Sequence, residues 1–572
     1  MNLKKIIDAR VSKALAKAGA PENSDAIVVP AARPQFGDYQ ANGCMAAAKK
    51  LKTNPRQFAE SVLEHLDLSD IADKVKLAGP GFINIFLKDS WLEENINAAS
   101  SDKKLGVELA REPKTVVVDY SSPNLAKEMH VGHLRSTIIG DAIARVSQFL
   151  GDNVIRQNHV GDWGTQFGML LNYMNETDGS GQSLADLEDF YRASKKRFDE
   201  DQDFATKSRE TVVKLQSGDE ACKKAWQNFL DISLSHCQKA YDKLGVGLTT
   251  EHVRGESFYN DDLPKVLKEL DEKGLLDESQ EAKGVFLEEF KNKDNERAFI
   301  IIQKSDGGYL YATTDLSALR FRADELKADR IFYVTDSRQA QHFAQVFTIA
   351  RKANFVPENI ELIHVPFGMM LGDDGKPFKT RTGGTVKLMD LLEEAISRAG
   401  ELVAEKNPEI TPEQKGKIAE VVGVGALKYA DLSQNRNSDY VFSWDKMISL
   451  EGNTAPYMQY AYARVRSIFR KANSDDSTLG KIIISEPQER ALAVKILQFA
   501  EIINSVADNA MPNILCSYLY DLAGAFMSFY EACPVLKSEQ PTKDSRLALC
   551  DLTSRVIGCG LDLLGINTIE QM

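Results

Sequence analysis

The amino-acid sequence predicts an α/β fold, in which a doubly wound parallel-sheet domain with insertions lies between a small α+β domain and an all-α bundle. At about 150 residues per domain, a chain of 572 residues is long enough for two to four domains. The apolar run at 115–119 is followed by a loop containing Pro123 and then by helical periodicity from Leu134. This is the pattern of a buried parallel strand and the helix after it. The last 120 or so residues contain almost no strand-like sequence.

The first domain is expected over residues 1–112. Apolar residues recur every four positions from residue 3 to residue 15, which predicts a helix with one buried face. A β-like run follows at 81–87, and a helical stretch leads from it into a linker rich in Lys, Glu and Pro near 111–114. Helices and strands in this order predict a small α+β domain.

The middle domain is expected over residues 113–450, opening with the strand, loop and helix described above. Such a unit begins a doubly wound sheet. A charged, helix-patterned stretch at 184–243 has the character of an insertion. Strand-like runs recur at 299–302 and 330–334, each followed by polar or helical sequence.

The last domain is expected over residues 451–572 as a helical bundle, in which 481–484 is the main strand-like run. The formal net charge of the whole chain is −13, which disfavours a protein held to nucleic acid by bulk charge. However, −11 of this charge falls on residues 113–450, and the two flanking segments are nearly neutral. Either flanking domain is therefore able to carry a local basic face.

The sequence predicts a soluble, cytoplasmic protein. Its seven cysteines are odd in number, widely spaced and without a Cys-x-x-Cys pair, which is typical of free thiols in a reducing compartment. The first 20 residues lack the uncharged apolar core of a signal peptide. No segment approaches the roughly 18 apolar residues of a membrane span.

The residues best placed for chemistry follow the first strand of the middle domain, in the segment SSPNLAKEMHVGHLRS at 121–136. Open α/β sheets bind ligands at the carboxyl ends of their strands. His130 and His133 start the next helix, where imidazoles and helix-terminal N–H groups suit a polyphosphate whose charge grows in a transition state. Gly132 between them allows a ligand to approach the backbone closely.

Two alternatives stay open for this histidine pair on the residues alone. It resembles half of a zinc site, although no cysteine or His-Glu-x-x-His pattern supplies further ligands. It is also compatible with a packed pair of histidines without a function. The chain has no Gly-x-x-x-x-Gly-Lys-Ser/Thr motif and no Gly-x-Gly-x-x-Gly after a strand, which disfavours P-loop NTPases and dinucleotide oxidoreductases.

Five segments together make the chain resemble the class I aminoacyl-tRNA synthetases, and among them the bacterial-type arginyl-tRNA synthetases. They are SSPNLAKEMHVGHLRS (121–136), NHVGDWGTQFG (158–168), YATTDLSAL (311–319), GKPFKTRTGG (375–384) and NTAPYMQYAYARVRS (453–467). The resemblance implies a Rossmann-type catalytic domain at 113–450 that uses ATP with Mg²⁺ to form arginyl-adenylate. It further implies transfer of arginine to tRNA-Arg, a D-loop-contacting domain at 1–112, an anticodon-binding domain at 451–572, and a monomer without a metal site of its own.

The resemblance assigns ATP binding and catalysis to two motifs. His130, Gly132 and His133 match the first, and would hold ATP and stabilise the pentacovalent α-phosphate. Lys376 and Lys379 occupy the two lysine places of the second, which reads Lys-Pro-Phe-Lys here in place of Lys-Met-Ser-Lys.

This departure at the second motif adds a further candidate. Family members with a changed second motif rely on a lysine just before the first motif. In this sequence that lysine is Lys127.

Recognition of arginine follows from the chemistry of its side chain. A guanidinium is a planar fork of donors that suits carboxylates and an aromatic neighbour. Tyr311 and Asp315 lie four residues apart, and the resemblance makes them the guanidinium readers. It also places Asp119, Asn124 and Gln339 in the arginine pocket. Taken alone, Asp315 is also compatible with a helix cap, since two threonines precede it.

Contacts with tRNA are assigned to both ends of the chain. Tyr457, Tyr460 and Arg464 share one face of a predicted helix, where aromatic rings and a guanidinium suit unstacked loop bases. The alternative is that the tyrosines are half-buried packing residues. The resemblance makes this helix the anticodon face and adds the C-terminal Met572, although Gln571 precedes it where the family has Arg.

In the first domain, the resemblance matches Phe82 and Asn84 to residues that contact the tRNA D-loop. A buried strand phenylalanine is the alternative for Phe82.

Three other functions are weighed against an arginyl enzyme. The cysteinyl type of class I synthetase needs thiolate zinc ligands, and the glutamyl type needs a basic pocket where Tyr311 and Asp315 lie. A catalytically silent, synthetase-like RNA-binding protein is the third possibility. This possibility is disfavoured by the intact His130, His133, Lys376 and Lys379, because a non-catalytic descendant need not retain them.

Overall fold

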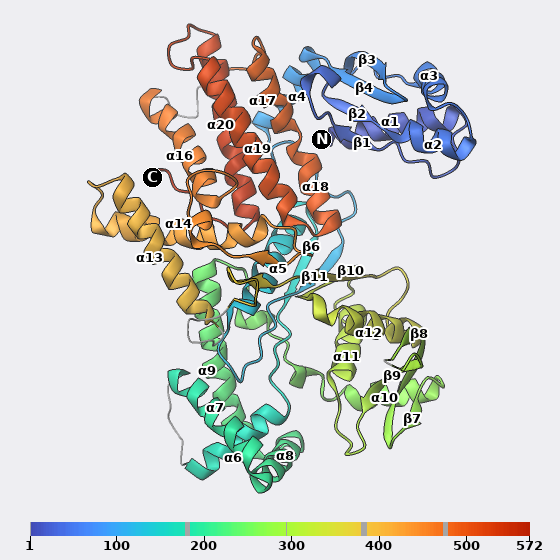
Figure 1. Ribbon diagram of the computed structural model, residues 1–572, viewed down its shortest axis with the longest axis vertical. Helices are drawn as coiled ribbons and strands as arrows, with labels where there is room; N and C mark the ends of the chain where they lie inside the picture. The colour runs from blue at the N-terminus through green and yellow to red at the C-terminus, as the bar shows by residue number, and fades with distance from the viewer. Residues whose placement is uncertain (1, 178–183, 293, 379–385, 473–478, 572) are drawn as a thin grey trace. The chain divides into compact units, whose positions relative to one another are not determined.

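The computed structural model describes residues 2–177, 184–292, 294–378, 386–472 and 479–571 (Figure 1). The chain divides into two units. One unit contains Ala110–Ser449 together with Leu563–Ile566. The other is built from both ends of the chain, namely Met1–Leu109, Leu450–Asp562 and Asn567–Met572.

A four-stranded parallel sheet forms the centre of the first unit, in the order β11-β10-β5-β6. Its strands are β5 (Thr115–Asp119), β6 (Asn153–Gln157), β10 (Arg330–Asp336) and β11 (Glu361–Phe367). The side chains of Val116, Val117 and Val118 are all buried, as expected for a strand covered on both faces. The predicted doubly wound α/β fold is therefore confirmed.

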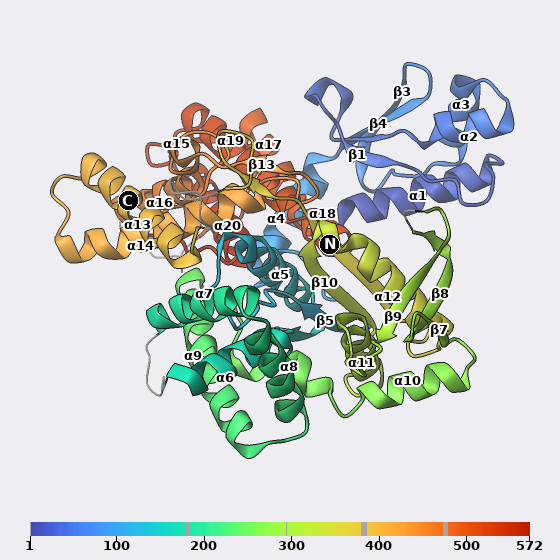
Figure 2. The same ribbon diagram turned by 60° about the horizontal axis from the view of Figure 1, so that its bottom comes forward.

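Helices cover this sheet, as Figure 2 shows for α5 and α12. The helix α5 (Val131–Phe149) follows β5 and packs on it beside α13 (Leu388–Lys406) and α14 (Pro412–Leu432). Helices α11 (Tyr311–Asp324) and α12 (Ala340–Lys352) share one apolar core with β5 and β10. The first residues of α5 and of α11 both lie near the carboxyl ends of the parallel strands.

Two insertions interrupt the parallel sheet. The first is helical, as the charged stretch at 184–243 predicts, and consists of α6 (Thr165–Thr177), α7 (Leu184–Glu200), α8 (Gln202–Gln216) and α9 (Glu220–Leu244). The second contains α10 (Leu263–Glu272) and a separate antiparallel sheet of β7 (Asp277–Ser279), β8 (Ala282–Lys291) and β9 (Arg297–Gln303). The strand-like run at 299–302 is thus a strand, but it lies outside the parallel sheet. Short elements β12 (Met370–Leu371), β13 (Tyr440–Val441) and α15 (Trp444–Met447) complete this unit.

The N-terminal segment of the second unit is an α+β structure, as predicted. Its antiparallel sheet has the order β1-β2-β4-β3, with strands β1 (Val28–Pro30), β2 (Tyr39–Ala41), β3 (Ala72–Ala78) and β4 (Phe82–Leu87). Its helices are α1 (Leu3–Lys17), α2 (Gly43–Leu51), α3 (Pro55–His65) and α4 (Asp89–Ser101). The apolar residues of α1 that recur every four positions are buried in the core of this segment.

The C-terminal segment of the same unit is helical, as predicted. It contains α16 (Ala455–Ala472), α17 (Pro487–Leu497), α18 (Phe499–Asn509), α19 (Pro512–Ala532) and α20 (Thr542–Leu563). The run at 481–484 is extended but forms no strand. The N–H groups of Ile482, Ile483 and Ile484 donate to the side chains of Asn97, Ser545 and Glu93 in place of a neighbouring strand.

Across the ranges that the structure describes, no helix is long and apolar enough to cross a membrane. All seven cysteines lie within those ranges, and no disulfide joins them.

Candidate active site and RNA-contacting surfaces

A cavity of about 670 Å³ lies at the carboxyl ends of β5 and β10. The chain order reverses between these neighbouring strands, and ligands of open α/β sheets bind at such switch points. The cavity is lined by side chains from the β5–α5 loop, the amino ends of α5 and α11, and the β10–α12 connection. It therefore collects residues that are far apart in the sequence.

The loop after β5 is held in an uncommon conformation. Ser121 and Ser122 have positive φ angles of 71° and 47°. Their N–H groups donate to the Ser136 hydroxyl and to Asn158 Oδ1, each over 2.9 Å. Backbone strain of this kind persists only where surrounding contacts enforce it, as in ligand sites.

His130 and His133 form a reciprocal cap at the start of α5. His130 Nδ1 accepts the Gly132 N–H and His133 Nδ1 accepts the His130 N–H, each at 3.0 Å. Because both Nδ1 atoms are acceptors, the ring protons lie on Nε2. The ring centroids are 4.0 Å apart, so both Nε2–H groups belong to one small region of the cavity wall.

Both imidazoles are held neutral near pH 7. Burial lowers the pKa of His130, with the nearby Lys127 ammonium as a second cause. Burial, and then proximity to His130, lowers the pKa of His133 to about 3. The pair therefore offers hydrogen-bond donors to an anion without carrying positive charge itself. A Cβ at Gly132 would lie 2.7 Å from the His130 ring, so glycine is also needed for the cap.

The part of the cavity wall that comes from α11 carries a carboxylate beside an aromatic ring. Tyr311 and Asp315 lie one turn apart in α11, and Tyr311 is 63% exposed. Asp315 Oδ2 accepts a hydrogen bond of 2.6 Å from His342 Nε2, and the Tyr311 and His342 ring centroids are 4.8 Å apart. The alternative that Asp315 caps a helix is wrong, because Leu310 is the N-cap residue and Asp315 lies in the second turn.

Sequence analysis did not identify Glu256, which lines the same cavity. Burial, together with the neighbouring carboxylates of Asp162 and Asp315, raises the pKa of Glu256 to about 8. Gly255 permits this proximity, because a Cβ there would lie 2.1 Å from an Asp162 carboxylate oxygen. A half-buried carboxyl beside other carboxylates is a natural place for a cation. No motif in the sequence around Glu256 signals this role.

The remaining predicted pocket residues also line the cavity, namely Asp119, Asn124 and Gln339. Asp119 accepts hydrogen bonds from Arg322 Nη2 at 2.7 Å and from the Ser122 hydroxyl at 3.0 Å. Its carboxylate therefore braces the strained loop. Asn124 Oδ1 accepts the Ala126 N–H at 3.0 Å, which leaves its amide NH₂ facing Gly161. Gln339 is exposed at the start of α12.

Of the three predicted lysines, the two that lie within the described residues do not line this cavity. Lys127 is exposed, and its ammonium lies 4.7 Å from the centroid of the Tyr191 ring. Lys376 is exposed in a turn in which its N–H donates to Asp374. Lys379 lies outside the described residues. The start of α5 is bonded to the chain just after the second motif, since the Val131 N–H donates to the Val386 carbonyl at 3.0 Å.

A cluster of aromatic residues and one arginine lies on α16 and α19. Tyr460 is 41% exposed, and the ring centroids of Tyr457 and Tyr520 are 5.8 Å apart. The Arg464 guanidinium lies 5.4 Å from the centroid of the Tyr530 ring. The structure thus brings together the three residues predicted on α16 and adds two tyrosines from α19 that sequence spacing did not connect to them.

The predicted D-loop residues lie on β4. Phe82 is partly exposed beside Gly79. Asn84 is only 3% exposed, and its Oδ1 accepts a hydrogen bond from Gln40 Nε2 at 2.7 Å. A contact between Asn84 and RNA therefore has to use the amide edge that Gln40 does not occupy. Met572 lies outside the described residues.

No group of three His, Cys, Asp or Glu side chains in the described part of the chain is arranged to hold a metal ion. The Nδ1 atoms of His130 and His133 already accept backbone N–H groups, which leaves only their Nε2 atoms open to a ligand.

Comparison with known families identifies three successive regions. Residues 2–87 match the arginyl tRNA synthetase N-terminal domain, and residues 95–444 match the catalytic domain of class I (R) tRNA synthetases. Residues 458–572 match the DALR anticodon binding domain.

Curated relatives cover the whole chain. The arginine–tRNA ligases of Chromobacterium violaceum and Hahella chejuensis are each 58% identical, over 100% of this chain and of their own length. Among solved structures, the arginyl-tRNA synthetase of Plasmodium falciparum matches with a TM-score of 0.88 and 34% identity, covering 100% of this chain and 99% of its own. The Thermus thermophilus enzyme matches with a TM-score of 0.85 and 25% identity, covering 100% of both chains. The resemblance predicted from five sequence segments is confirmed, and the chain belongs to the class I arginyl-tRNA synthetases.

Proposed function

We infer that this chain ligates L-arginine to tRNA-Arg at the expense of ATP, by way of an arginyl-adenylate. One observation carries the active-site assignment. A single cavity holds neutral imidazole donors at the end formed by His130 and His133, and carboxylates at the end formed by Glu256 and Asp315. Such a cavity suits a polyphosphate and a guanidinium in the same complex.

At the carboxylate end, Asp315 and Glu256 accept from the guanidinium and Tyr311 lies beside its plane. Paired hydrogen bonds between a guanidinium and a carboxylate combine charge with geometric fit, which favours arginine over lysine. Asn124 and Gln339 hold the α-amino and carboxylate groups of the substrate. Asp119 acts indirectly by bracing the loop at Ser122.

At the imidazole end, ATP binds with Mg²⁺ as its substrate metal. The arginine carboxylate attacks the α-phosphate in line, and pyrophosphate leaves. Nε2–H groups of His130 and His133 donate to the α-phosphate oxygens as negative charge grows there, which is catalysis by fixed dipoles. The candidates for meeting the leaving pyrophosphate are Lys127, Lys376 and Lys379. A tRNA 2′-hydroxyl then takes arginine from the adenylate, as in class I.

We propose three functional domains, with residues 1–112 contacting the tRNA D-loop, 113–450 catalysing the reaction and 451–572 binding the anticodon. In the first domain Phe82 and Asn84 contact the RNA, with Gln40 orienting Asn84. In the last domain Tyr457, Tyr460 and Arg464 form the stacking face, joined by Tyr520 and Tyr530. The C-terminal Met572 is a second candidate for contact with the anticodon. We further propose that the enzyme is a monomer of the cytosol.

The decisive experiment is aminoacylation of total tRNA with each of the twenty amino acids, followed by ATP–pyrophosphate exchange. We expect charging with arginine alone, and exchange that is negligible until tRNA is added. Charging with another amino acid would overturn the assignment of Glu256 and Asp315. Binding of tRNA without any charging would instead indicate a silent RNA-binding descendant.

A further inference from the structure

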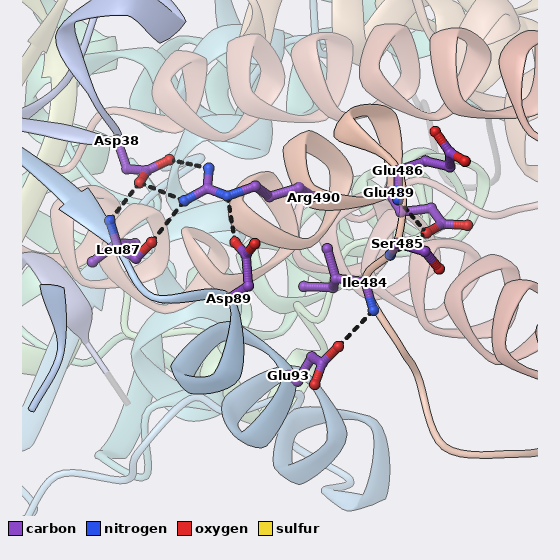
Figure 3. Close-up of polar contacts among 9 residues, drawn as sticks. All are labelled: Asp38, Leu87, Asp89, Glu93, Ile484, Ser485, Glu486, Glu489 and Arg490. Atoms are coloured by element: carbon purple, nitrogen blue, oxygen red, sulfur yellow. Dashed lines mark hydrogen bonds and ion pairs between the residues drawn. The ribbon is translucent and has the colours of Figure 1, made fainter. Parts of the chain in front are cut away.

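Within the unit built from both chain ends, Arg490 of α17 joins the helical bundle to the N-terminal segment (Figure 3). Its Nη1 and Nη2 donate to the two carboxylate oxygens of Asp38, at 2.7 and 2.9 Å. Nε donates to Asp89 at 2.7 Å, and Nη2 also donates to the Leu87 carbonyl at 2.9 Å. One guanidinium thus bonds to a loop, the end of β4 and the start of α4.

This ion pair is partly shielded from water and structurally integrated. The side chains of Arg490 and Asp38 are 29% and 9% exposed. Asp38 Oδ2 also accepts the Leu87 N–H at 2.7 Å. Hydrogen bonds to Asp38 hold the pKa of Arg490 above its ordinary value. A forked, partly buried pair of this kind contributes more than an exposed surface salt bridge.

Side chains of α4 bind the backbone just before α17. Glu93 accepts the Ile484 N–H at 2.8 Å, as Figure 3 also shows, and Asn97 bonds to both the N–H and the carbonyl of Ile482. From α20, Arg555 donates to the Ser100 and Asp102 carbonyls. These bonds are independent of Arg490 and tie α4 to the bundle along its length.

The apolar core of the N-terminal segment continues into the bundle. Ile484, Val494 and Leu497 pack against that core. The buried Tyr39 hydroxyl of β2 donates to Glu501 of α18 at 3.0 Å. The joint therefore combines a forked ion pair, backbone hydrogen bonds and shared apolar packing, which together favour a fixed arrangement over a flexible tether.

We propose that this joint fixes the spacing between the β4 surface at Phe82 and the α16–α19 aromatic face, so that the two surfaces grip one tRNA as a single preorganised body. Arg490 is a positioning residue in this proposal, since it contacts no substrate. The proposal rests on the function inferred above, because it needs both surfaces to bind RNA. Two linked surfaces gain affinity from effective concentration only when their geometry matches the span on the ligand.

The test compares two variants that each remove one forked Arg–Asp pair. Arg490→Gln breaks the joint, whereas Arg10→Gln breaks the Arg10–Asp70 pair, which lies wholly within the N-terminal segment. Each protein is titrated with full-length tRNA-Arg transcript and with its isolated anticodon stem-loop. For Arg490→Gln we expect binding of the full tRNA to weaken about 5- to 20-fold, with stem-loop binding and the KM for arginine unchanged. Arg10→Gln should match the parent in both titrations.

Hydrogen exchange separates loosening of the joint from general instability. Arg490→Gln should speed exchange in α4 and at residues 482–486 but not in the core of α1 or α19. If Arg490→Gln is poorly folded, Asp89→Ala removes only one bond, from a carboxylate that is 61% exposed, and should weaken full-length tRNA binding about 2-fold. Equal loss for tRNA and stem-loop, or an unchanged affinity for full-length tRNA, overturns the proposal. If the parent enzyme binds neither RNA, the inferred function fails instead.

Discussion

The two ends of the active-site cavity recognise opposite charges in different ways. At the phosphate end, His130 and His133 are neutral, and their ring orientation is set by backbone N–H groups. At the guanidinium end, Glu256 and Asp315 are acidic groups placed close together. Fixed neutral dipoles need no counter-charge when ATP is absent, whereas burial and the neighbouring carboxylates keep Glu256 mostly protonated near pH 7 until a cation arrives. We therefore expect the phosphate end to contribute to catalysis and the guanidinium end to selective binding of arginine.

The largest effect should come from the guanidinium end. Asp315→Ala removes a carboxylate that pairs with the substrate cation, and losing one partner of a buried charged pair costs about 3–5 kcal/mol. We expect kcat/KM for arginine to fall roughly 10²- to 10⁴-fold, while binding of tRNA stays near the parent value. Steady-state charging and a filter-binding titration measure the two quantities. Unaffected charging would remove Asp315 from the pocket.

A substitution at the phosphate end should lower kcat. His133→Ala removes the Nε2–H donor, whose hydrogen bond to the α-phosphate strengthens in the transition state. Loss of one such donor lowers the rate about 10²- to 10³-fold. His133→Gln retains an amide donor and should recover part of this loss. Single-turnover formation of arginyl-adenylate in the presence of tRNA is the measurement. A change confined to the KM for arginine would contradict the assignment.

The sequence predicts one end of the cavity better than the other, because only one end is formed by residues that are close together along the chain. The His-Val-Gly-His segment forms a cap within one helical turn, so the proximity of its two histidines follows from the sequence. Glu256 enters the cavity only because the loop around Gly255 approaches Asp162, a contact that no local pattern encodes. The parallel sheet was predictable from apolar runs at 115–119 and 330–334. The absence of a strand at residues 481–484 was not predictable, because the side chains of Asn97 and Glu93 accept the hydrogen bonds that a strand partner would have accepted.

The pH dependence of arginine binding distinguishes the two ends further. The pKa of Glu256 is about 8 in the free enzyme, and a bound guanidinium favours the ionised form. Binding below pH 8 therefore releases a proton, so the KM for arginine should fall about tenfold per unit as the pH rises towards 8, and then level off. Glu256→Gln should flatten this profile, and its KM should approach that of the parent at low pH. KM measured from pH 6 to pH 9 is the test, and an unchanged slope in Glu256→Gln would assign the proton to another group.

The smallest effect should come from the residue that orients Asp315. His342 donates to Asp315 over 2.6 Å and lies beside Tyr311, so it fixes the carboxylate that the guanidinium meets. His342→Gln keeps a donor of similar reach, and we expect the KM for arginine to rise about 2- to 5-fold with kcat unchanged. His364→Gln is the matched control, because His364 bonds to Thr335 and stacks on Phe343 without reaching Asp315. A fall in kcat for His342→Gln, or an equal rise in KM for the control, would show that His342 supports the fold of this region and does not orient Asp315.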